Sequence, residues 1–135
     1  MKKYTITLTE EQLRLVADSM EDYHRFLAGE CRMEHATQYI ELSRDRQFLR
    51  EQMGRLEHMF ITPDLPQGSS YDWAGSYCPN EHQRKAIAMS YMIYREILHH
   101  FAMQRRPKDT WNCLLGPTLT CEEQGPLIKI EEVEK

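Results

Sequence analysis

The positions of the prolines limit where long helices can form in this chain. The six prolines all lie beyond residue 62: Pro63, Pro66, Pro79, Pro107, Pro117 and Pro126. Proline breaks a helix interior because it lacks a backbone N–H and its ring clashes with the preceding turn. Long helices are therefore expected only before residue 62 and between residues 80 and 106. The segment 62–79, which also contains Gly68 and Gly75, is predicted to be an irregular loop.

The first helix is predicted over residues 10–29. The Thr9 hydroxyl can accept a hydrogen bond from the backbone N–H of Gln12 while the Gln12 side chain reaches back to Thr9, which is a capping box. Apolar side chains then recur on one helix face: Leu13, Val16, Ala17, Met20, Tyr23 and Leu27. Gly29 is expected to end or bend this helix because glycine is a poor helix former.

Two further helices are predicted, over residues 36–60 and 80–104. The first of them repeats apolar residues at helical spacing, and whether it is separate from the helix at 10–29 or continues it after a kink is left open. The second begins at Asn80, where Gln83 is placed for another capping box. Its apolar stripe is Ile87, Tyr91, Tyr94, Leu98 and Phe101.

Short β-prone segments lie near both ends of the chain. Residues 4–8 alternate apolar side chains with threonines, as a half-buried strand does. Residues 118–121 and 127–133 are predicted to form a hairpin. Because isolated two-stranded pieces are marginally stable, we expect these segments to join in one small sheet packed on the helices. The predicted fold class is therefore α+β, a single domain over residues 1–135 with three main helices and a terminal sheet.

Composition excludes several classes of protein. A chain of 135 residues can bury a core without disulfides or metals. Its formal net charge of −4, with both signs mixed, argues against a protein held on nucleic acid by net charge. No apolar run approaches the roughly 18 residues needed to span a bilayer. The four cysteines contain no Cys-x-x-Cys pair and the start lacks a secretory apolar region, so a cytoplasmic protein with reduced thiols is expected.

Two Glu-x-x-His pairs have a spacing found in metal-binding helix bundles. They are Glu21 with His24 and Glu96 with His99. Di-metal carboxylate sites also need a glutamate from each of two further helices, and only three helices are predicted here. Chance pairing on solvated faces is the simpler interpretation.

Cysteine and histidine spacing gives two further candidates. His24, Cys31 and His35 could share one helix face as zinc ligands, with Cys78 as the fourth, although Gly29 interrupts that helix. Cys78 also precedes a helix start, with His82 four residues later, but no third catalytic member is evident. We therefore predict no metal site, no cofactor and no catalytic residue. A metal-dependent enzyme is kept as a third alternative.

The predicted loop is rich in aromatic side chains, with Tyr71, Trp73 and Tyr77 within seven residues. Such rings can stack on nucleobases when they are exposed, and the helix start that follows offers free N–H groups to an anion. We predict a pocket for a small anionic nucleotide-like ligand. Its predicted residues are Tyr71, Trp73, Tyr77, Arg84, Lys85, His24 and Arg25. The competing interpretation is that Trp73 and Tyr77 fold back over the third helix, as side chains of long loops often do.

Apolar surface on the later helices favours association. The helix at 36–60 carries many soft apolar side chains, and residues 91–94 make the third helix apolar nearly all round. A helix that is apolar on several faces needs cover on several faces, so we predict a homo-oligomer. A second functional hypothesis follows, in which the helix at 36–60 and the aromatic loop bind and inhibit or redirect a host protein.

Four segments together resemble a group of small phage and prophage proteins from gut bacteria that have no established activity. These segments are residues 4–16, 21–29 and 78–85 and the tail at 117–133. The resemblance implies a phage setting, hence the cytoplasm of a host cell, and it supplies no catalytic residues. By analogy it implies a non-enzymatic protein that sequesters a nucleotide-derived immune signal.

Overall fold

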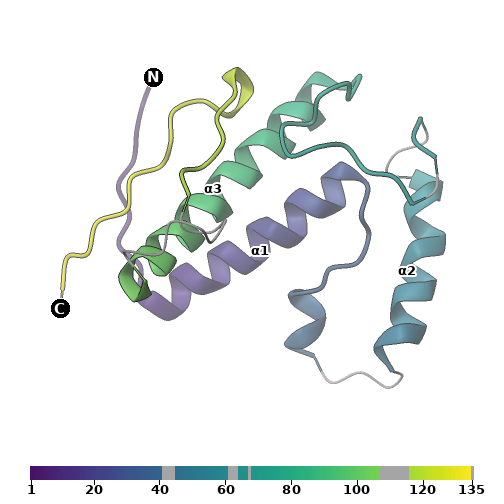
Figure 1. The fold of residues 1–135 in the computed structure, drawn as a ribbon, viewed down its shortest axis with the longest axis horizontal. Helices are drawn as coiled ribbons and strands as arrows, with labels where there is room; N and C mark the ends of the chain where they lie inside the picture. The colour runs from purple at the N-terminus through teal and green to yellow at the C-terminus, as the bar shows by residue number, and fades with distance from the viewer. Residues whose placement is uncertain (41–44, 61–63, 67, 107–115, 135) are drawn as a thin grey trace.

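The computed structural model describes residues 1–40, 45–60, 64–66, 68–106 and 116–134 (Figure 1). Within these residues the chain forms helices α1 (Glu10–Ala28), α2 (Arg46–Phe60) and α3 (Glu81–Arg105), with two short 3-10 helices, η1 (Ala36–Gln38) and η2 (Glu122–Gln124). None of the described helices is both long and apolar enough to cross a membrane.

The ends of α1 follow from local chemistry. The capping box at Thr9 and Gln12 is confirmed, with both reciprocal hydrogen bonds present. Gly29 ends the helix in a left-handed conformation with φ of 111°, and its N–H is directed at the carbonyl oxygens of Arg25 and Phe26. This conformation is easy for glycine and strained for other residues. The first two predicted helices are therefore separate elements.

The start of α3 is tied to the end of α1. The Asn80 side chain caps α3 by accepting from the N–H of Gln83 at 3.0 Å. The Gln83 side chain then reaches across to α1 and donates to the carbonyl oxygen of Leu27 at 2.8 Å. Only half of the predicted capping box is therefore present: Asn80 caps the helix, but the Gln83 side chain makes a tertiary contact with α1 that the sequence did not indicate.

The core lies between α1 and α3, which run alongside each other in Figure 1. One buried cluster joins Ala17 of α1 to Ile97 and Phe101 of α3. A second cluster lies nearer the start of α3 and contains Ala28, Tyr71, Cys78 and Ile87. Burial of this apolar surface is the main force holding the two helices together.

The predicted α+β fold is wrong, because the described residues contain no β-strand and the part of the chain that they cover is all-helical. The strand predicted at 4–8 is extended but unpaired, with Tyr4 and Ile6 exposed. In the segment 127–133, Ile128 and Ile130 instead pack against the α1–α3 core, whereas residues 131–133 are exposed. The alternating pattern shows only that one face of the segment is covered. A segment that packs on helices has this pattern just as a strand in a sheet does.

The predicted hairpin at 118–121 and 127–133 is replaced by a turn. Residues Glu122–Gln124 form η2, which packs on α3. The Gln124 side chain is buried and accepts from the N–H of Cys121 at 2.9 Å. The N–H of Ile128 points at the Met92 sulfur, 3.4 Å away, so this backbone group is not used in a strand ladder.

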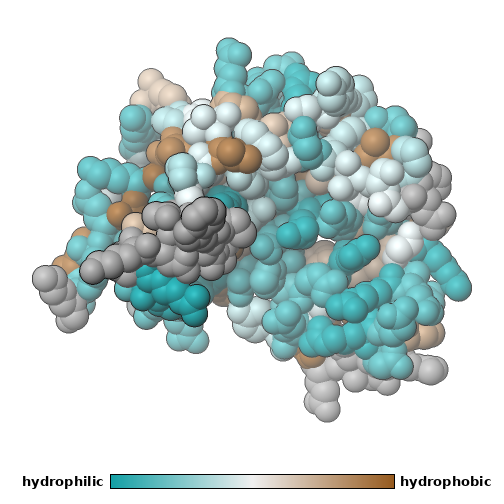
Figure 2. Space-filling view, in the orientation of Figure 1, coloured by the Kyte–Doolittle hydropathy of each residue, from teal (hydrophilic) through white to brown (hydrophobic). Residues whose placement is uncertain are grey.

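Helix α2 stands apart from the α1–α3 pair. The predicted helix at 36–60 is divided: its first residues form η1, residues 41–44 lie outside the described part, and α2 begins at Arg46. Among the described elements, α2 packs on neither α1 nor α3. Polar contacts hold it to the segment after α1, namely Glu57 to the N–H of Cys31, Arg50 to Glu34 and Arg46 to Thr37. Hydrophilic side chains dominate the face of the molecule seen in Figure 2.

Candidate functional site

Tyr71, one of the predicted ligand-binding residues, belongs to the core. Its ring is buried with Ala28, Cys78 and Ile87. Its backbone N–H donates to the carbonyl oxygen of Ala28 at 2.8 Å, and its hydroxyl donates to Asp64. Tyr71 therefore fastens the loop to the end of α1 and does not present its ring to a ligand.

Trp73 and His24 meet in a cluster of rings between the loop, α1 and α3. The ring centroids of Trp73 and Tyr91 are 5.0 Å apart, and His24 packs against both Tyr91 and Tyr94. His24 is buried, and its Nδ1 lies 2.8 Å from the carbonyl oxygen of Ile87. Burial lowers the pKa of His24 and raises the pKa of Tyr94 to about 12, so both rings are neutral packing elements near pH 7.

Tyr77 is the ring of the loop that faces outward. Its side chain is 97% exposed, and its backbone has φ of 67°. The three rings predicted to act together thus occupy different environments: Tyr71 in the core, Trp73 half-buried on Tyr91 and Tyr77 in solvent.

The predicted cationic residues all have partners. Arg84 lies 3.3 Å from Glu123 and donates to the carbonyl oxygen of Cys78 at 2.8 Å. Lys85 pairs with Glu81, and Arg25 pairs with Glu30 and, at 3.9 Å, with Glu21. None of the seven predicted residues lines either of the two cavities described below.

The histidines considered as metal ligands point in different directions. His24 faces the core and His35 faces carboxylates of α1. Within the described part of the chain, no group of three or more histidine, cysteine, aspartate or glutamate side chains is placed to hold a metal ion.

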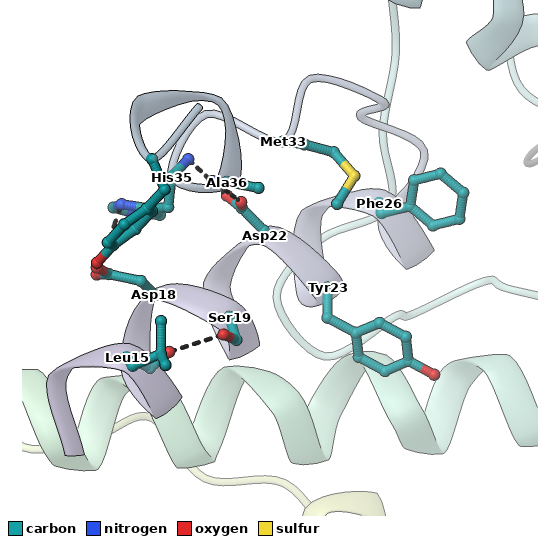
Figure 3. A pocket seen from close by; sticks show the side chains of 10 residues that line it. Leu15, Asp18, Ser19, Asp22, Tyr23, Phe26, Met33, His35 and Ala36 are labelled. Atoms are coloured by element: carbon teal, nitrogen blue, oxygen red, sulfur yellow. Dashed lines mark hydrogen bonds and ion pairs between the residues drawn. The ribbon is translucent and has the colours of Figure 1, made fainter. Parts of the chain in front are cut away.

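A groove that sequence reasoning missed lies between α1 and residues 33–39 (Figure 3). Its volume is about 570 Å³. Leu15, Tyr23 and Phe26 form an apolar floor on α1, and Met33 and Tyr39 stand on the opposite wall. We call this feature the α1 groove.

Asp22 holds the wall of the α1 groove in place. The carboxylate points from α1 toward the backbone at His35 and Ala36 in Figure 3. It accepts from the N–H of His35 at 3.0 Å and from that of Ala36 at 2.6 Å. These groups belong to the start of η1, where N–H groups lack partners within the helix. A residue only 3% exposed thus caps a helix that begins fourteen positions later in the chain.

His35 adds a second link between the wall and α1. Its Nε2 lies 2.7 Å from Glu21 and its Nδ1 lies 3.5 Å from Asp18, which also accepts from the Tyr39 hydroxyl at 2.9 Å. Because each imidazole nitrogen faces a carboxylate, neither is directed at a substrate. This arrangement suits an ionic clamp and does not suit a general base.

The charge of His35 follows from the same contacts. Burial acts to lower the pKa of His35, but the hydrogen bond to Glu21 and the negative charges of Glu21, Asp18 and Asp22 outweigh burial, so the pKa lies above its ordinary value. The imidazolium form is therefore favoured in the folded protein.

We expect the clamp to make stability depend on pH. A histidine whose pKa is raised by folding stabilises the folded state fully below its unfolded pKa, about 6.5, and this stabilisation is lost as pH rises through the folded pKa. Urea denaturation of the wild type and of His35→Gln from about pH 5 to 8 should give a difference in unfolding free energy that shrinks as pH rises. His24, whose pKa is lowered, acts with the opposite sign and cancels in this difference. A constant difference would show that His35 does not act through its charge.

A second cavity, of about 500 Å³, lies between α2 and residues 32–34. Its lining mixes positive side chains, Arg32 and Arg50, with several glutamates. Three of its charged groups already have partners, since Arg50 pairs with Glu34 and Glu57 accepts from a backbone N–H. The site has no consistent charge that would select a ligand.

The two cavities therefore differ in kind. The α1 groove combines an exposed apolar floor with a rim that carries two carboxylates, Asp18 and Asp22, beside the imidazole of His35. No family model, curated protein or solved structure matches the chain, so the geometry alone bears on its role.

Proposed function

We propose that this protein is a non-enzymatic binding protein that docks a polypeptide segment in the α1 groove. The segment would carry apolar side chains and positive charge. The observation that supports the proposal is the combination of an exposed apolar floor with an excess of carboxylates beside it. Opposite charges around an apolar contact speed the encounter of two partners and fix the register in which they bind.

The shape of the floor favours a polypeptide. Leu15 and Phe26 are eleven residues apart on α1, which corresponds to about 16 Å along a helix. An open apolar stripe of this length can receive the apolar face of an amphipathic helix, whose anchors recur at intervals of three and four residues. The acidic rim disfavours an anionic ligand in the same groove.

The phage setting implied by the sequence resemblance is part of this proposal. In that setting, the groove would occupy a segment of a host protein and so inhibit or redirect it. The nucleotide-like ligand considered from the sequence would require a different surface, because the aromatic loop packs Tyr71 and Trp73 against the protein itself.

A pair of designed peptides tests the proposal. One is a helical peptide of about 15 residues with leucines on one face and lysines on the other, and its match has glutamates in place of the lysines. Fluorescence anisotropy should show binding of the lysine peptide at least about tenfold tighter than of the glutamate peptide, a difference of about 1.4 kcal/mol.

Two tyrosine variants locate the binding. Tyr23→Ala removes part of the groove floor and should weaken binding of the lysine peptide about tenfold, while Tyr77→Ala, at an exposed tyrosine outside the groove, should leave it unchanged. Equal binding of both peptides, or a loss confined to Tyr77→Ala, would refute the proposal. Binding of ADP-ribose or a cyclic nucleotide that is abolished by Trp73→Ala would favour the nucleotide-like ligand instead.

A further inference from the structure

We infer that a second copy of this chain binds along the segment 126–132 by laying its own segment 2–8 beside it in an antiparallel direction. The exchange is reciprocal and lies between chains, so each chain keeps its all-helical fold. This surface is separate from the α1 groove, and the inference does not depend on the proposed function. It is carried by unused backbone groups, by the register of the side chains and by the positions of the two segments in the fold.

Both segments have backbone groups without partners. Figure 1 shows them as extended chain. Within the described part of the protein, the backbone of residues 4–8 makes no hydrogen bond. Among the described N–H groups of residues 126–132, that of Ile128 is the one that donates, to the Met92 sulfur. Extended chains with unused N–H and C=O groups are ready templates for pairing with another chain.

The contact between Ile128 and Met92 determines which edge of the segment 126–132 is open. In an extended chain, the N–H groups of successive residues point to opposite edges. The even-numbered residues therefore face the side of α3 that carries Met92. Pro126, which has no N–H to donate, falls on this closed edge. Residues 127, 129 and 131 direct their N–H and C=O groups to the opposite edge, where a partner can pair with them.

One antiparallel register also satisfies the apolar side chains. Placing Ile6 opposite Ile128 puts Tyr4 opposite Ile130, on the face that packs against the α1–α3 core. These are non-hydrogen-bonded pairs, in which the side chains lie closest. Tyr4 and Ile6 are 85% and 75% exposed in a single chain, and this register covers them. The hydrogen-bonded pairs are Thr7 with Leu127, Thr5 with Lys129 and Lys3 with Glu131.

Charge favours the same register. Lys2 comes opposite Glu132, and neither side chain has an ion-pair partner within the described residues. Lys3 comes opposite Glu131, which also lies 2.8 Å from Lys129 in an exposed pair. Cross-strand pairs of opposite charge stabilise the pairing of two strands. The unpaired Lys2 and Glu132 thus complement each other across the two copies.

A single chain cannot form this pairing with itself, because the register places Leu8 beside Pro126. A salt bridge from Arg84 to η2 holds the following Pro126 near the start of α3. Leu8 precedes α1, whose Arg14 lies over the Phe101 ring near the end of α3. Positions 84 and 101 are about 25 Å apart along a helix. The two segments of one chain also run in the same direction in Figure 1, so the antiparallel partner comes from another copy.

Sedimentation velocity tests the dimer with a proline variant and a matched control. At about 100 µM the wild type should be dimeric. Thr5→Pro removes an N–H that the pairing uses and should weaken dimerisation at least about tenfold, whereas Thr5→Ala keeps this N–H and should remain dimeric. Thr5 is exposed and makes no hydrogen bond within the described part of one chain, so both variants should fold, which circular dichroism checks.

An exchange of charges tests the register. Lys2→Glu and Glu132→Lys should each weaken dimerisation about tenfold, because each places two pairs of like charges in a twofold dimer. A chain that carries both substitutions should recover the affinity of the wild type. A monomeric wild type, or a Thr5→Pro variant as dimeric as Thr5→Ala, would overturn the inference. So would a double variant no better than either single one, or a Glu132→Lys variant without effect, which would place segment 2–8 against another surface.

Discussion

Replacing Asp22 with alanine is expected to lower the unfolding free energy by about 2–4 kcal/mol and to weaken groove binding at least about tenfold. The Asp22 carboxylate accepts from two backbone N–H groups at the start of η1, and hydrogen bonds to a charged group contribute about 1.5–3 kcal/mol each. Without it, residues 33–39 lose their cap and the groove loses its wall. Urea denaturation and anisotropy with the lysine peptide measure the two effects.

Asp72 offers a matched control. Its carboxylate also accepts from two backbone N–H groups, those of Ala74 and Ser76, but in an exposed loop where water can replace it. Asp72→Ala should therefore cost less than about 1 kcal/mol and leave peptide binding unchanged. If Asp22→Ala and Asp72→Ala were equally mild, Asp22 would not be the residue that holds the groove.

Replacing Ile97 with alanine is expected to cost about 2–5 kcal/mol of unfolding free energy. Ile97 is almost fully buried and joins Ala17 and Phe101 in the α1–α3 core. Truncation removes apolar contacts and leaves a cavity that the two helices cannot close. Thermal and urea denaturation both report the loss.

Two further substitutions calibrate this result. Ile97→Val should cost only about 0.5–1.5 kcal/mol, because a single methylene is removed. Ile40→Ala, at an exposed isoleucine, should change stability by less than about 0.5 kcal/mol. A small loss for Ile97→Ala would contradict a core centred between α1 and α3.

Local chemistry made the helices predictable. The capping box at Thr9 depends on residues three apart, and the left-handed end at Gly29 depends on one residue, so both could be inferred from the sequence. The same applies to the cap at Asn80. What the sequence could not give is the packing of α2, because its apolar stripe is equally compatible with cover from its own chain or from another.

The sheet was predicted wrongly because alternation does not specify what covers the apolar face. Ile128 and Ile130 alternate with polar residues, as strand residues do, yet they cover helices. Pairing of residues 4–8 with this segment would have required a contact across almost the whole chain, about which local sequence carries no information. An alternating segment next to a helical core can therefore either pair in a sheet or pack on the helices.

The candidate site depends on contacts between distant residues. Composition placed Tyr71, Trp73 and Tyr77 in a loop, but Tyr91 of α3 and Ala28 of α1 determine which of those rings are covered. Asp22 is an unremarkable residue in the sequence of α1, and its role appears only when η1 folds back over it. The signal available in the sequence was the position of Asp22, one helical turn after Asp18. This spacing does not by itself show that Asp22 caps another segment.

The central claim is that the α1 groove is the binding surface, and nuclear magnetic resonance mapping tests it most directly. Isotope-labelled protein would be titrated with the lysine peptide while backbone amide shifts are followed. We expect the largest changes along Leu15–Phe26 and at residues 33–39, with Trp73–Tyr77 unaffected. Changes centred on the aromatic loop, or spread over α3 with the groove silent, would contradict the account.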